Sequence, residues 1–497
     1  MMEIVDFLKD SESYPHETNA DIKHLETHIS HVYLCGDYAY KMKKSLDLGF
    51  LDFTSLEKRK FYCEEELRLN SIFAPELYLE VVPIYEKDGQ FSFQQKGRVV
   101  EYVLKMKEFE QEQILSRIVE RGDFTAELFT ELAQKLARLH QKGVSSEEIN
   151  SFASVGNIRK IALQNFAQTD KYKGKCISEK SFERIQKFTL NFINEHKVLF
   201  DARRQSGKIR ECHGDLHLNN ICLYKGEILF FDRIEFNEEF RNIDVVYDLA
   251  FLVMDLHFRK QFSLATRVIN EYFEQSGDYE GAALLNFYAG MRAYIRGKVI
   301  SFRSDNSEIT DQEKDENRAE ARAYFDLAES YATDQKAKLW ITSGLSGSGK
   351  STVARRIAAE KQFLIIRSDA LRKHLTGVPL YEKGPEQIYN SEISQATYNK
   401  MIELADFLSS FGISVILDAR FDNRKMRSKA MNLAEKKQLD FKIVYCQADP
   451  QVLKRRLDQR SGDVSDADAS LIDQQIETFE DFSREENGYL FDLLVDV

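Results

Sequence analysis

Apolar and polar residues alternate in short runs through the first hundred residues, a period-2 pattern that is typical of strands. These runs cover residues 31–34, 38–42, 77–85, 91–93 and 99–106. The turn-forming pair Gly36-Asp37 joins the first two runs and predicts a hairpin, while helical spacing predicts a helix over 55–73. The N-terminal pattern therefore predicts a small antiparallel sheet with one helix.

Helical spacing of apolar residues dominates from about residue 125 to residue 331. The clearest example is a row of four leucines, Leu128, Leu132, Leu136 and Leu139. Two short strand-like runs, at 220–223 and 228–231, interrupt the helical pattern. A larger helical lobe is therefore expected to follow the small sheet.

The end of this helical region is rich in charge. Residues 304–335 contain few helix breakers, which predicts an exposed helix rather than a flexible linker, and the domain boundary is expected near Thr333–Lys338. We therefore predict a first α+β domain over residues 1–335, with a small lobe at about 1–106 and a helical lobe at about 107–335.

Beyond the boundary, strand-like and helix-like segments alternate regularly. They cover 338–343, 352–360, 363–367, 391–409, 414–417, 425–436, 441–447 and 450–458. Such alternation predicts a parallel sheet with helices on both faces. Residues 336–497 are therefore predicted to form a second, α/β domain.

Length and composition agree with a two-domain globular protein. A chain of 497 residues exceeds what one hydrophobic core usually organises, and 43% apolar with 30% charged residues suits a folded chain with a charged surface. The net charge is −12, and residues 338–497 contain 23 basic and 24 acidic side chains, so the acidity lies in the first domain. Nucleic acid is therefore a possible partner that the charge does not favour.

Cysteine spacing and apolar run lengths set further limits. The six cysteines form no CxxC pair, which predicts reduced thiols without a zinc site. The N-terminal residues lack the pattern of a signal peptide, and no run reaches ~18 uninterrupted apolar residues. These features predict a cytoplasmic protein with no membrane partner; they say nothing of its oligomeric state.

The strongest motif is Gly344-Leu345-Ser346-Gly347-Ser348-Gly349-Lys350-Ser351, which fits GxxxxGK[ST] between a predicted strand and a predicted helix. Gly344, Gly347, Ser348 and Gly349 are expected to turn backbone N–H groups toward the phosphates of ATP at a helix N-terminus. Lys350 is expected to reach the β and γ phosphates, Ser351 to hold Mg²⁺, and Thr352 to approach the α phosphate.

Four further polar residues follow predicted strands or helices of the second domain. Asp369 and Arg372, after the second strand, are candidates for activating an acceptor hydroxyl and neutralising the transferred phosphate; a helix cap with a solvated arginine is the alternative. Asp418 ends the third strand, as a carboxylate that steers Mg²⁺ would. Arg460 is a candidate lid residue over ATP, or part of a solvated face.

Together these motifs resemble small P-loop kinases of the polynucleotide kinase, gluconate kinase and zeta-toxin type over the second domain. The resemblance implies the P-loop NTPase fold, with Asp369 as the catalytic base and Arg460 on an ATP lid. Ser465-Asp466-Ala467-Asp468 also resembles the end of such kinases, without an evident chemical role.

A second motif lies in the first domain, where His213-Gly214-Asp215 and Asn220 give HxDxxxxN and Asp232 follows a short hairpin. Asp215 is expected to orient or accept the proton of a substrate hydroxyl. Asn220 and Asp232 present oxygen atoms suited to Mg²⁺. His213 is expected to be a scaffold residue.

Such a site also needs a lysine on a strand of the small lobe, paired with a helical glutamate. Lys41 fits through the order Ala39-Tyr40-Lys41, and Lys43 is an alternative because period 2 places it on the same face. Among Glu64, Glu65 and Glu66 in the predicted helix, we choose Glu66 as the partner of the lysine, with Glu65 as the next candidate. The alternative is that all three form a solvent-exposed acidic run without a role in the site.

The first domain resembles the aminoglycoside phosphotransferase family, which has the bilobal protein-kinase-like fold, over roughly residues 25–300. Leu139-His140, Asp244 and Asp248 extend the resemblance, and the two aspartates are expected to support the catalytic loop. The sequence lacks a GxGxxG loop, and Arg-Ile-Glu follows Asp232 where protein kinases have Phe-Gly. The order of the two domains resembles bacterial fused proteins with an aminoglycoside phosphotransferase-like half and a P-loop kinase-like half.

The sequence thus predicts a bifunctional ATP-dependent phosphotransferase that uses Mg²⁺ in each half and transfers the γ-phosphoryl group to hydroxyls of small-molecule acceptors. Two alternatives stay open. In one, a non-catalytic N-terminal module binds nucleotide or ligand and gates the P-loop half. In the other, the protein is a nucleic-acid 5′-end kinase.

Overall fold

The computed structural model describes residues 2–18, 22–49, 51–307, 309–333 and 335–491. Contacts divide the chain into two compact units. The first comprises Met1–Phe124, Gly143–Ile158 and His196–Leu252, and the second comprises Thr125–Lys142, Arg159–Glu195 and Val253–Val497. The domain boundary predicted near residue 335 lies inside the second unit and stays a prediction, and Asp334 in that segment is outside the described residues.

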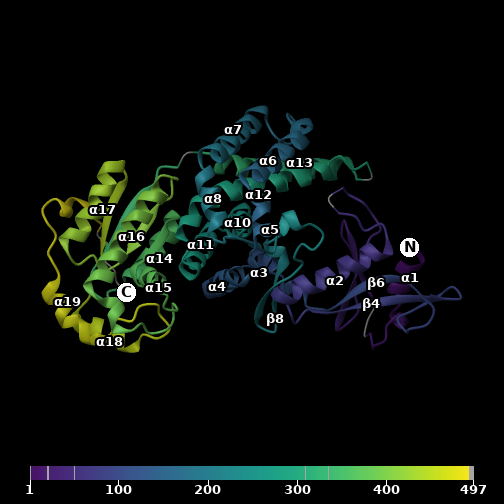
Figure 1. Ribbon diagram of the computed structural model, residues 1–497, viewed down its shortest axis with the longest axis horizontal. Coiled ribbons are helices and arrows are strands. Elements are labelled where there is room, and N and C mark those ends of the chain that lie inside the picture. The colour runs from purple at the N-terminus through teal and green to yellow at the C-terminus, as the bar shows by residue number, and fades with distance from the viewer. Residues whose placement is uncertain (1, 19–21, 50, 308, 334, 492–497) are drawn as a thin grey trace. The chain divides into compact units, whose positions relative to one another are not determined.

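A six-stranded antiparallel sheet forms the centre of the first unit, with strand order β1-β2-β3-β6-β4-β5. The expected hairpin pairs β2 with β3 so that Val32 lies opposite Lys41. Helix α2 packs against β6 and β4 (Figure 1) and begins where the Ser55 side chain accepts a hydrogen bond from the Lys58 N–H. The strands are β1 Lys23–Glu26, β2 Ser30–Leu34, β3 Tyr38–Lys43, β4 Tyr78–Lys87, β5 Gln90–Ser92 and β6 Arg98–Lys107; the helix is α2 Leu56–Phe73.

The remainder of the first unit consists of short helices and two small sheets, in which β10 pairs with β7 and β8 pairs with β9. The elements are α1 Met2–Lys9, α3 Leu115–Arg121, α5 Glu147–Phe152, α8 Lys197–Gln205, β7 Ile209–Glu211, β8 Ile221–Tyr224, β9 Glu227–Phe230, α9 Glu238–Arg241 and β10 Asn242–Asp244. Helices α6 Val155–Thr169 and α10 Val245–Phe258 begin in this unit and end in the second. The loop between β7 and β8 contains the HxDxxxxN motif.

The helices of the second unit include α4 Ala126–Lys142, α7 Glu179–Glu195, α11 Phe262–Ser276, α12 Ala282–Arg303 and α13 Asp311–Tyr331. The charge-rich segment does form a helix, α13, and a capping box between Thr310 and Glu313 begins it. The expectation that this helix is exposed is wrong for one face. Tyr324 and Phe325 are buried where α13 packs against α12, so this helix belongs to the core.

The C-terminal part of the second unit is a five-stranded sheet in which every pairing is parallel, with order β12-β13-β11-β14-β15. The predicted α/β fold is therefore confirmed. Its strands are β11 Lys338–Ser343, β12 Leu364–Arg367, β13 Val415–Asp418, β14 Asp440–Tyr445 and β15 Leu490–Phe491. The helices are α14 Lys350–Lys361, α15 Ser368–Thr376, α16 Ser391–Ser409, α17 Arg424–Lys437, α18 Pro450–Gln459 and α19 Ile472–Thr478.

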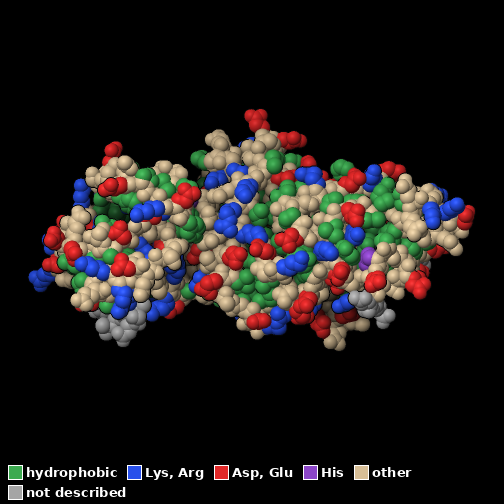
Figure 2. All heavy atoms as spheres, turned by 90° about the horizontal axis from the view of Figure 1, so that it is seen from below, with side chains coloured by type: hydrophobic (Ala, Val, Ile, Leu, Met, Phe, Trp, Pro, Cys, Tyr) green, Lys and Arg blue, Asp and Glu red, His purple; other side chains and the backbone are tan. Residues whose placement is uncertain are grey.

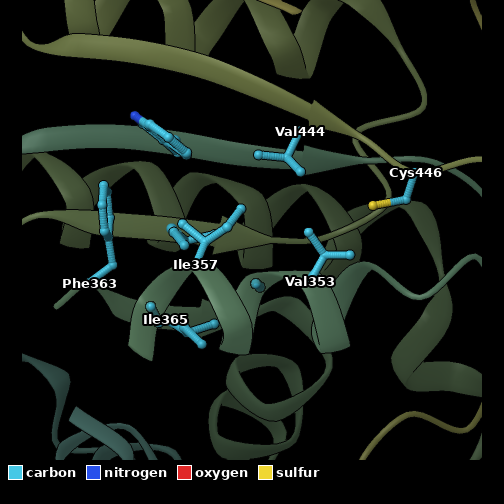
Figure 3. Close-up of a cluster of buried hydrophobic side chains, with 10 residues drawn as sticks. Val353, Ile357, Phe363, Ile365, Val444 and Cys446 are labelled. Atoms are coloured by element: carbon cyan, nitrogen blue, oxygen red, sulfur yellow. The ribbon is translucent and has the colours of Figure 1, made fainter. Parts of the chain in front are cut away.

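Alternation along the strands gives this sheet its core. Ile365 and Val444 meet Val353 and Ile357 of α14 on one side of the sheet (Figure 3), and Trp340 belongs to the same buried cluster. Burial of each such side chain contributes about 1.5–3 kcal/mol, so the helix that follows the glycine-rich loop is held firmly on the sheet. Because all strands are parallel, the residues that follow β11, β12 and β13 lie at one edge of the sheet.

Acidic and basic side chains are interspersed over the face drawn in Figure 2. In the described part of the chain, every helix is too short or too polar to cross a lipid bilayer.

Candidate functional site

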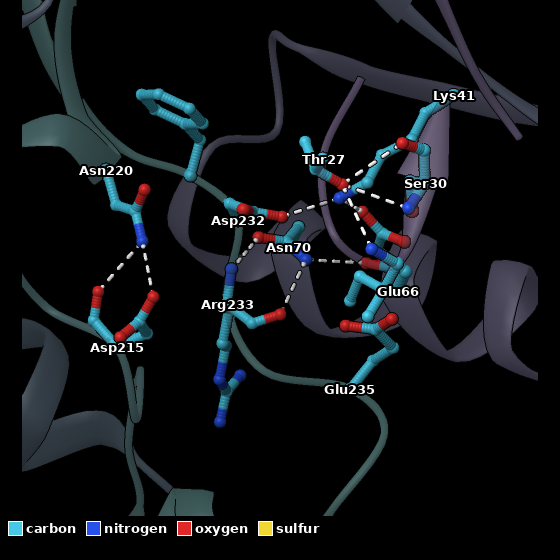
Figure 4. Close-up of polar contacts among 12 residues, drawn as sticks. Thr27, Ser30, Lys41, Glu66, Asn70, Asp215, Asn220, Asp232, Arg233 and Glu235 are labelled. Carbon is cyan, nitrogen blue, oxygen red and sulfur yellow. Dashed lines mark hydrogen bonds and ion pairs between the residues drawn. The ribbon is translucent and has the colours of Figure 1, made fainter. Parts of the chain in front are cut away.

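In the first unit, the structure brings Lys41 together with two carboxylates (Figure 4). The Lys41 Nζ atom lies 2.7 Å from Glu66 Oε1 and 2.6 Å from Asp232 Oδ1. Burial alone would lower the pKa of Lys41, but Asp232 and Glu66 together raise it well above its ordinary value. Lys41 therefore stays positively charged beside Asp232, whose side chain is 46% exposed.

Lys43 lies on the same face of β3, as period 2 requires, but it is not an equivalent alternative to Lys41. Its side chain is 1% exposed, and its ammonium donates to Glu66 Oε2 at 2.7 Å and also pairs with Glu235. Burial alone would raise the pKa of Glu66, but Lys41 and Lys43 hold it below its ordinary value. Burial raises the pKa of Glu235. Lys43 offsets this shift only in part, and the negative charge of Glu66 raises the pKa further. Glu66 is thus the shared anion of two lysines.

The other two glutamates of the acidic run face different partners. Glu64 pairs with Lys60 at 3.7 Å on the exposed side of α2, as a solvated acidic run would. Glu65 lies 2.5 Å from Arg68. Of the three glutamates, the structure places Glu66 against Lys41.

Backbone contacts fix the position of Asp232. This residue has a left-handed φ of 61°, and its N–H donates to the Tyr78 hydroxyl at 2.9 Å. The next residue, Arg233, is anchored from both sides, because its N–H donates to Asn70 Oδ1 and its guanidinium donates to the Cys212 carbonyl. An uncommon backbone conformation held by such contacts is typical of functional sites.

The catalytic-loop candidates Asp215 and Asn220 contact each other directly. The Asn220 amide donates to the Asp215 carbonyl at 2.9 Å and to its carboxylate at 3.1 Å, which leaves the amide oxygen of Asn220 as the acceptor suited to a cation (Figure 4). The His217 Nε2 atom lies 3.4 Å from the same carboxylate. The loop thus presents one carboxylate and one amide.

Buried groups beneath the loop hold its shape. Asp248 accepts hydrogen bonds from the N–H groups of His213 and Gly214, both at 2.9 Å. His213 is fully buried and its Nε2 contacts the Phe231 carbonyl at 2.9 Å, so it is a scaffold residue; burial lowers its pKa. Gly214 has φ of 88°, and a Cβ there would lie 2.8 Å from the Phe240 carbonyl oxygen. Asp248 supports the loop as expected.

Asp244 has a different partner from Asp248. Its carboxylate pairs with the buried Arg203, at 2.8 Å between Oδ1 and Nη2. This pair fixes the end of β10 rather than the catalytic loop.

In the second unit, the glycine-rich loop joins β11 to α14. Gly344, Gly347 and Gly349 have φ of 135°, 79° and 87°, values that side chains disfavour. A Cβ at Gly344 would lie 2.2 Å from the Cys446 carbonyl oxygen, so that position requires glycine. The Lys350 Nζ donates to the Leu345 carbonyl at 2.7 Å across the loop. Burial lowers the pKa of Lys350, and Asp418 opposes that shift in part.

Asp418 lies directly beside the loop. Its carboxylate accepts from the Ser351 hydroxyl at 2.6 Å and from the Thr342 hydroxyl at 2.9 Å. A hydroxyl and a carboxylate in contact at the start of a helix are the oxygen donors that Mg²⁺ uses beside bound phosphates. Ser348 is buried at the centre of the loop and Thr352 is exposed on α14.

Asp369 and Arg372, the candidates for contact with the acceptor, lie on helix α15. The sequence suggested a helix here only through the alternative in which Asp369 caps one. Asp369, in its first turn, pairs with Arg372 at 2.9 Å, and the guanidinium lies 4.9 Å from the centre of the Tyr389 ring. Arg372 is buried, and its Nε has no hydrogen-bond partner among the described residues. Both side chains project from one face, as the i,i+3 spacing requires.

Arg460 ends α18 and holds the segment that follows it. Its guanidinium donates to the carbonyls of Ser465 and Ala467. Asp466 in this segment pairs with Lys373 at 2.9 Å and accepts from the Gly384 N–H at 2.8 Å. The segment that had no evident role is therefore a brace between α18 and the loop after α15.

All the C-terminal candidates except Gly344 and Ser348 line one cavity of about 790 Å³. It is bounded by the glycine-rich loop, α15, the end of β13 and the exit from α18, and it is large enough for a nucleotide and a small acceptor together. Among the lining residues that the sequence did not indicate are Arg367, Tyr389, Tyr398 and Gln475. Gln475 accepts a hydrogen bond from the Ser346 N–H at 2.9 Å. The two residues are 129 positions apart in the sequence, so no local pattern indicated their contact.

Comparisons with known proteins match the two regions separately. Residues 62–285 match a family described as the phosphotransferase enzyme family, and residues 339–482 match one described as an AAA domain. Uncharacterized protein Rv2004c of Mycobacterium tuberculosis (strain ATCC 25618 / H37Rv) is 31% identical over 450 residues, covering 90% of this chain and 88% of that protein. Uncharacterized protein Mb2027c of Mycobacterium bovis (strain ATCC BAA-935 / AF2122/97) gives the same values.

The solved structures similar to parts of this chain include kinases. A choline/ethanolamine kinase family protein from Mesorhizobium loti is 13% identical and covers 67% of this chain and 99% of its own, with a TM-score of 0.38. A gluconokinase from Sinorhizobium meliloti 1021 is 24% identical and covers 30% of this chain and 78% of its own, with a TM-score of 0.22.

Proposed function

We propose that both regions of this chain are active kinases. The chain is a phosphotransferase that belongs to the same family as protein Rv2004c. It joins an aminoglycoside phosphotransferase-like region to a P-loop kinase region. Each transfers the γ-phosphoryl group of Mg·ATP to a hydroxyl of a small-molecule acceptor. The observation that carries the proposal is that each unit contains its own set of a lysine, oxygen donors suited to a cation and a further carboxylate.

In the first unit, Lys41 binds the phosphates and Glu66 fixes its position, at 2.7 Å. Asn220 and Asp232 hold Mg²⁺, to which amide and carboxylate oxygens are suited. Asp215 accepts the proton of the acceptor hydroxyl while the acceptor oxygen forms a bond to the γ phosphorus. The bond from that phosphorus to the β–γ bridging oxygen breaks, and ADP leaves.

In the second unit, the N–H groups of the loop that contains Gly344, Gly347, Ser348 and Gly349 bind the phosphates at the start of α14, next to Lys350 and Thr352. Ser351 and Asp418 hold Mg²⁺, which offsets the negative charge of the phosphate oxygens when bound. Asp369 accepts the acceptor proton, Arg372 neutralises the transferred group, and Arg460 holds residues 461–468, the lid segment, over the nucleotide.

The test is incubation of the full chain with γ-labelled ATP and fractionated cell metabolites, in parallel with nucleic-acid 5′ ends. We expect two labelled small molecules, one lost in Lys350→Ala and the other in Asp215→Asn. One labelled species, lost only in Lys350→Ala, would contradict activity of the first unit and support a gating module. Label on nucleic-acid ends alone would contradict the small-molecule acceptor.

A further inference from the structure

Helix α11, which precedes the P-loop region by some sixty residues, completes an edge of the parallel sheet. Strand β12 is an edge strand, so one side of its backbone lacks a partner strand among the described residues. Asn270 of α11 fills that role, because its side chain accepts from the Ile365 N–H at 2.6 Å and donates to the Phe363 carbonyl at 3.0 Å. Asn270 is buried, and α11 also packs against α14. The helix is therefore fixed to the sheet.

One turn further along α11, Glu274 reaches the end of the same strand. Its carboxylate lies 3.0 Å from Nη1 of Arg367, the last residue of β12, which is 5% exposed. The other nitrogens of Arg367 face two more carboxylates, with Nη2 2.7 Å from Asp463 and Nε 3.7 Å from Asp418. Arg367 thus joins α11, the lid segment after α18, and the carboxylate that contacts Ser351.

Arg367 lies at unequal distances from its three carboxylate partners. The two short contacts, to Glu274 and Asp463, satisfy the ends of the guanidinium, and Asp418 is left at the longest distance. Without the negative charge at 274, the guanidinium has two carboxylates left, and its attraction to Asp418 grows. An arginine that pairs closely with Asp418 opposes cation binding there, because the two positive charges compete for the same carboxylate.

We propose that Glu274 is a positioning residue of the P-loop site, which holds Arg367 away from Asp418 and so keeps Asp418 free for Mg²⁺. The proposal rests on the proposed function of this site. It means that a helix outside the P-loop fold contributes to the P-loop kinase. The backbone carbonyl of Glu274 also contacts His374 Nε2 at 2.7 Å, which fixes α11 to the helix that contains Asp369.

The experiment uses the full chain with Asp232→Asn, so that nucleotide binding reports the P-loop site. Calorimetry with a non-hydrolysable ATP analogue is run with and without Mg²⁺ on the parent, Glu274→Gln and Glu274→Ala. We expect Mg²⁺-dependent affinity to fall roughly tenfold in Glu274→Ala, as for the loss of one charge-assisted hydrogen bond, and less in Glu274→Gln. Affinity without Mg²⁺ should stay within about twofold, because Asp418 then has no cation to hold.

Glu280→Gln is the matched control. Glu280 pairs with Lys400 at 3.0 Å, which joins the segment just after α11 to α16, and neither residue lines the cavity. The control should bind like the parent. Unchanged affinity in both Glu274 variants would overturn the inference, as would an equal fall with and without Mg²⁺. A parent that binds no nucleotide would overturn the proposed function instead.

Discussion

Substitution of Glu66 tests the N-terminal cluster most severely, because one buried carboxylate serves two buried ammonium groups. Its two oxygens lie 2.7 Å from Lys41 and 2.7 Å from Lys43, and its side chain is 1% exposed. Removing one partner of a buried ion pair costs about 3–5 kcal/mol, because the remaining charge stays desolvated. Lys43 retains Glu235, and Lys41 retains Asp232, so we expect the lower end, about 3 kcal/mol, for Glu66→Gln.

The pH dependence of this effect has a definite sign. The folded-state pKa of Glu66 is depressed, so its ion pairs stabilise the fold above the ordinary glutamate pKa and are lost as pH falls through the folded value. The parent and Glu66→Gln should therefore differ most near neutral pH and converge as pH falls from about 4.5 to about 2.

Hydrogen exchange on the full chain measures this locally, because peptides from β3 and α2 report their own opening free energies. Glu66→Gln should lower protection there by about 3 kcal/mol and weaken nucleotide binding in a Lys350→Ala background. Glu64→Gln is the control: its exposed i,i+4 pair with Lys60 should contribute at most about 0.5 kcal/mol. Equal protection in the two variants would refute the reasoning.

Three further predictions concern the other groups. Lys350→Ala should remove turnover by the P-loop site, measured by product analysis in an Asp232→Asn background. The control Lys361→Ala, at the far end of α14, should leave this turnover unchanged. Turnover at the parent level in Lys350→Ala would contradict the assignment of Lys350. Asp232→Asn should weaken Mg·ATP binding by the first unit, whereas Asp215→Asn should leave calorimetric binding intact and slow transfer. Burial lowers the pKa of His257 to about 4. The free energy of unfolding, measured by denaturant titration, should therefore fall by about 3 kcal/mol between pH 6.5 and pH 4, and His257→Gln should remove that loss. An equal loss in the parent and in His257→Gln would contradict this prediction.

The elements that the sequence predicted well are those whose signal is local. The period-2 runs, the helix expected over 55–73 and the alternation after residue 338 each have a sequence signal that lies within a few residues of the structure it specifies. Short or polar elements were missed for the same reason. Strand β15 has two residues, and β1 consists of Lys-His-Leu-Glu, which shows no apolar alternation.

The candidate site divides in the same way. The glycine-rich loop and the lysine of β3 have spacing that dictates their geometry, whereas the choice among Glu64, Glu65 and Glu66 had no such pattern behind it. Arg367 and Gln475 had no such signal, because their partners come from α11, the segment after α18 and the loop before α14. The face of α13 that is buried also depends on α12, which no local pattern reveals.

The number of nucleotides bound per chain tests the central claim most directly. Calorimetric titration of the full chain with a non-hydrolysable ATP analogue and Mg²⁺ should give about two sites, since the two units each contain a complete set of binding groups. The count should fall to about one in Lys350→Ala and to about one in Asp232→Asn. A count of one for the parent, in protein shown to be free of copurified nucleotide, would contradict the claim that both regions are kinases.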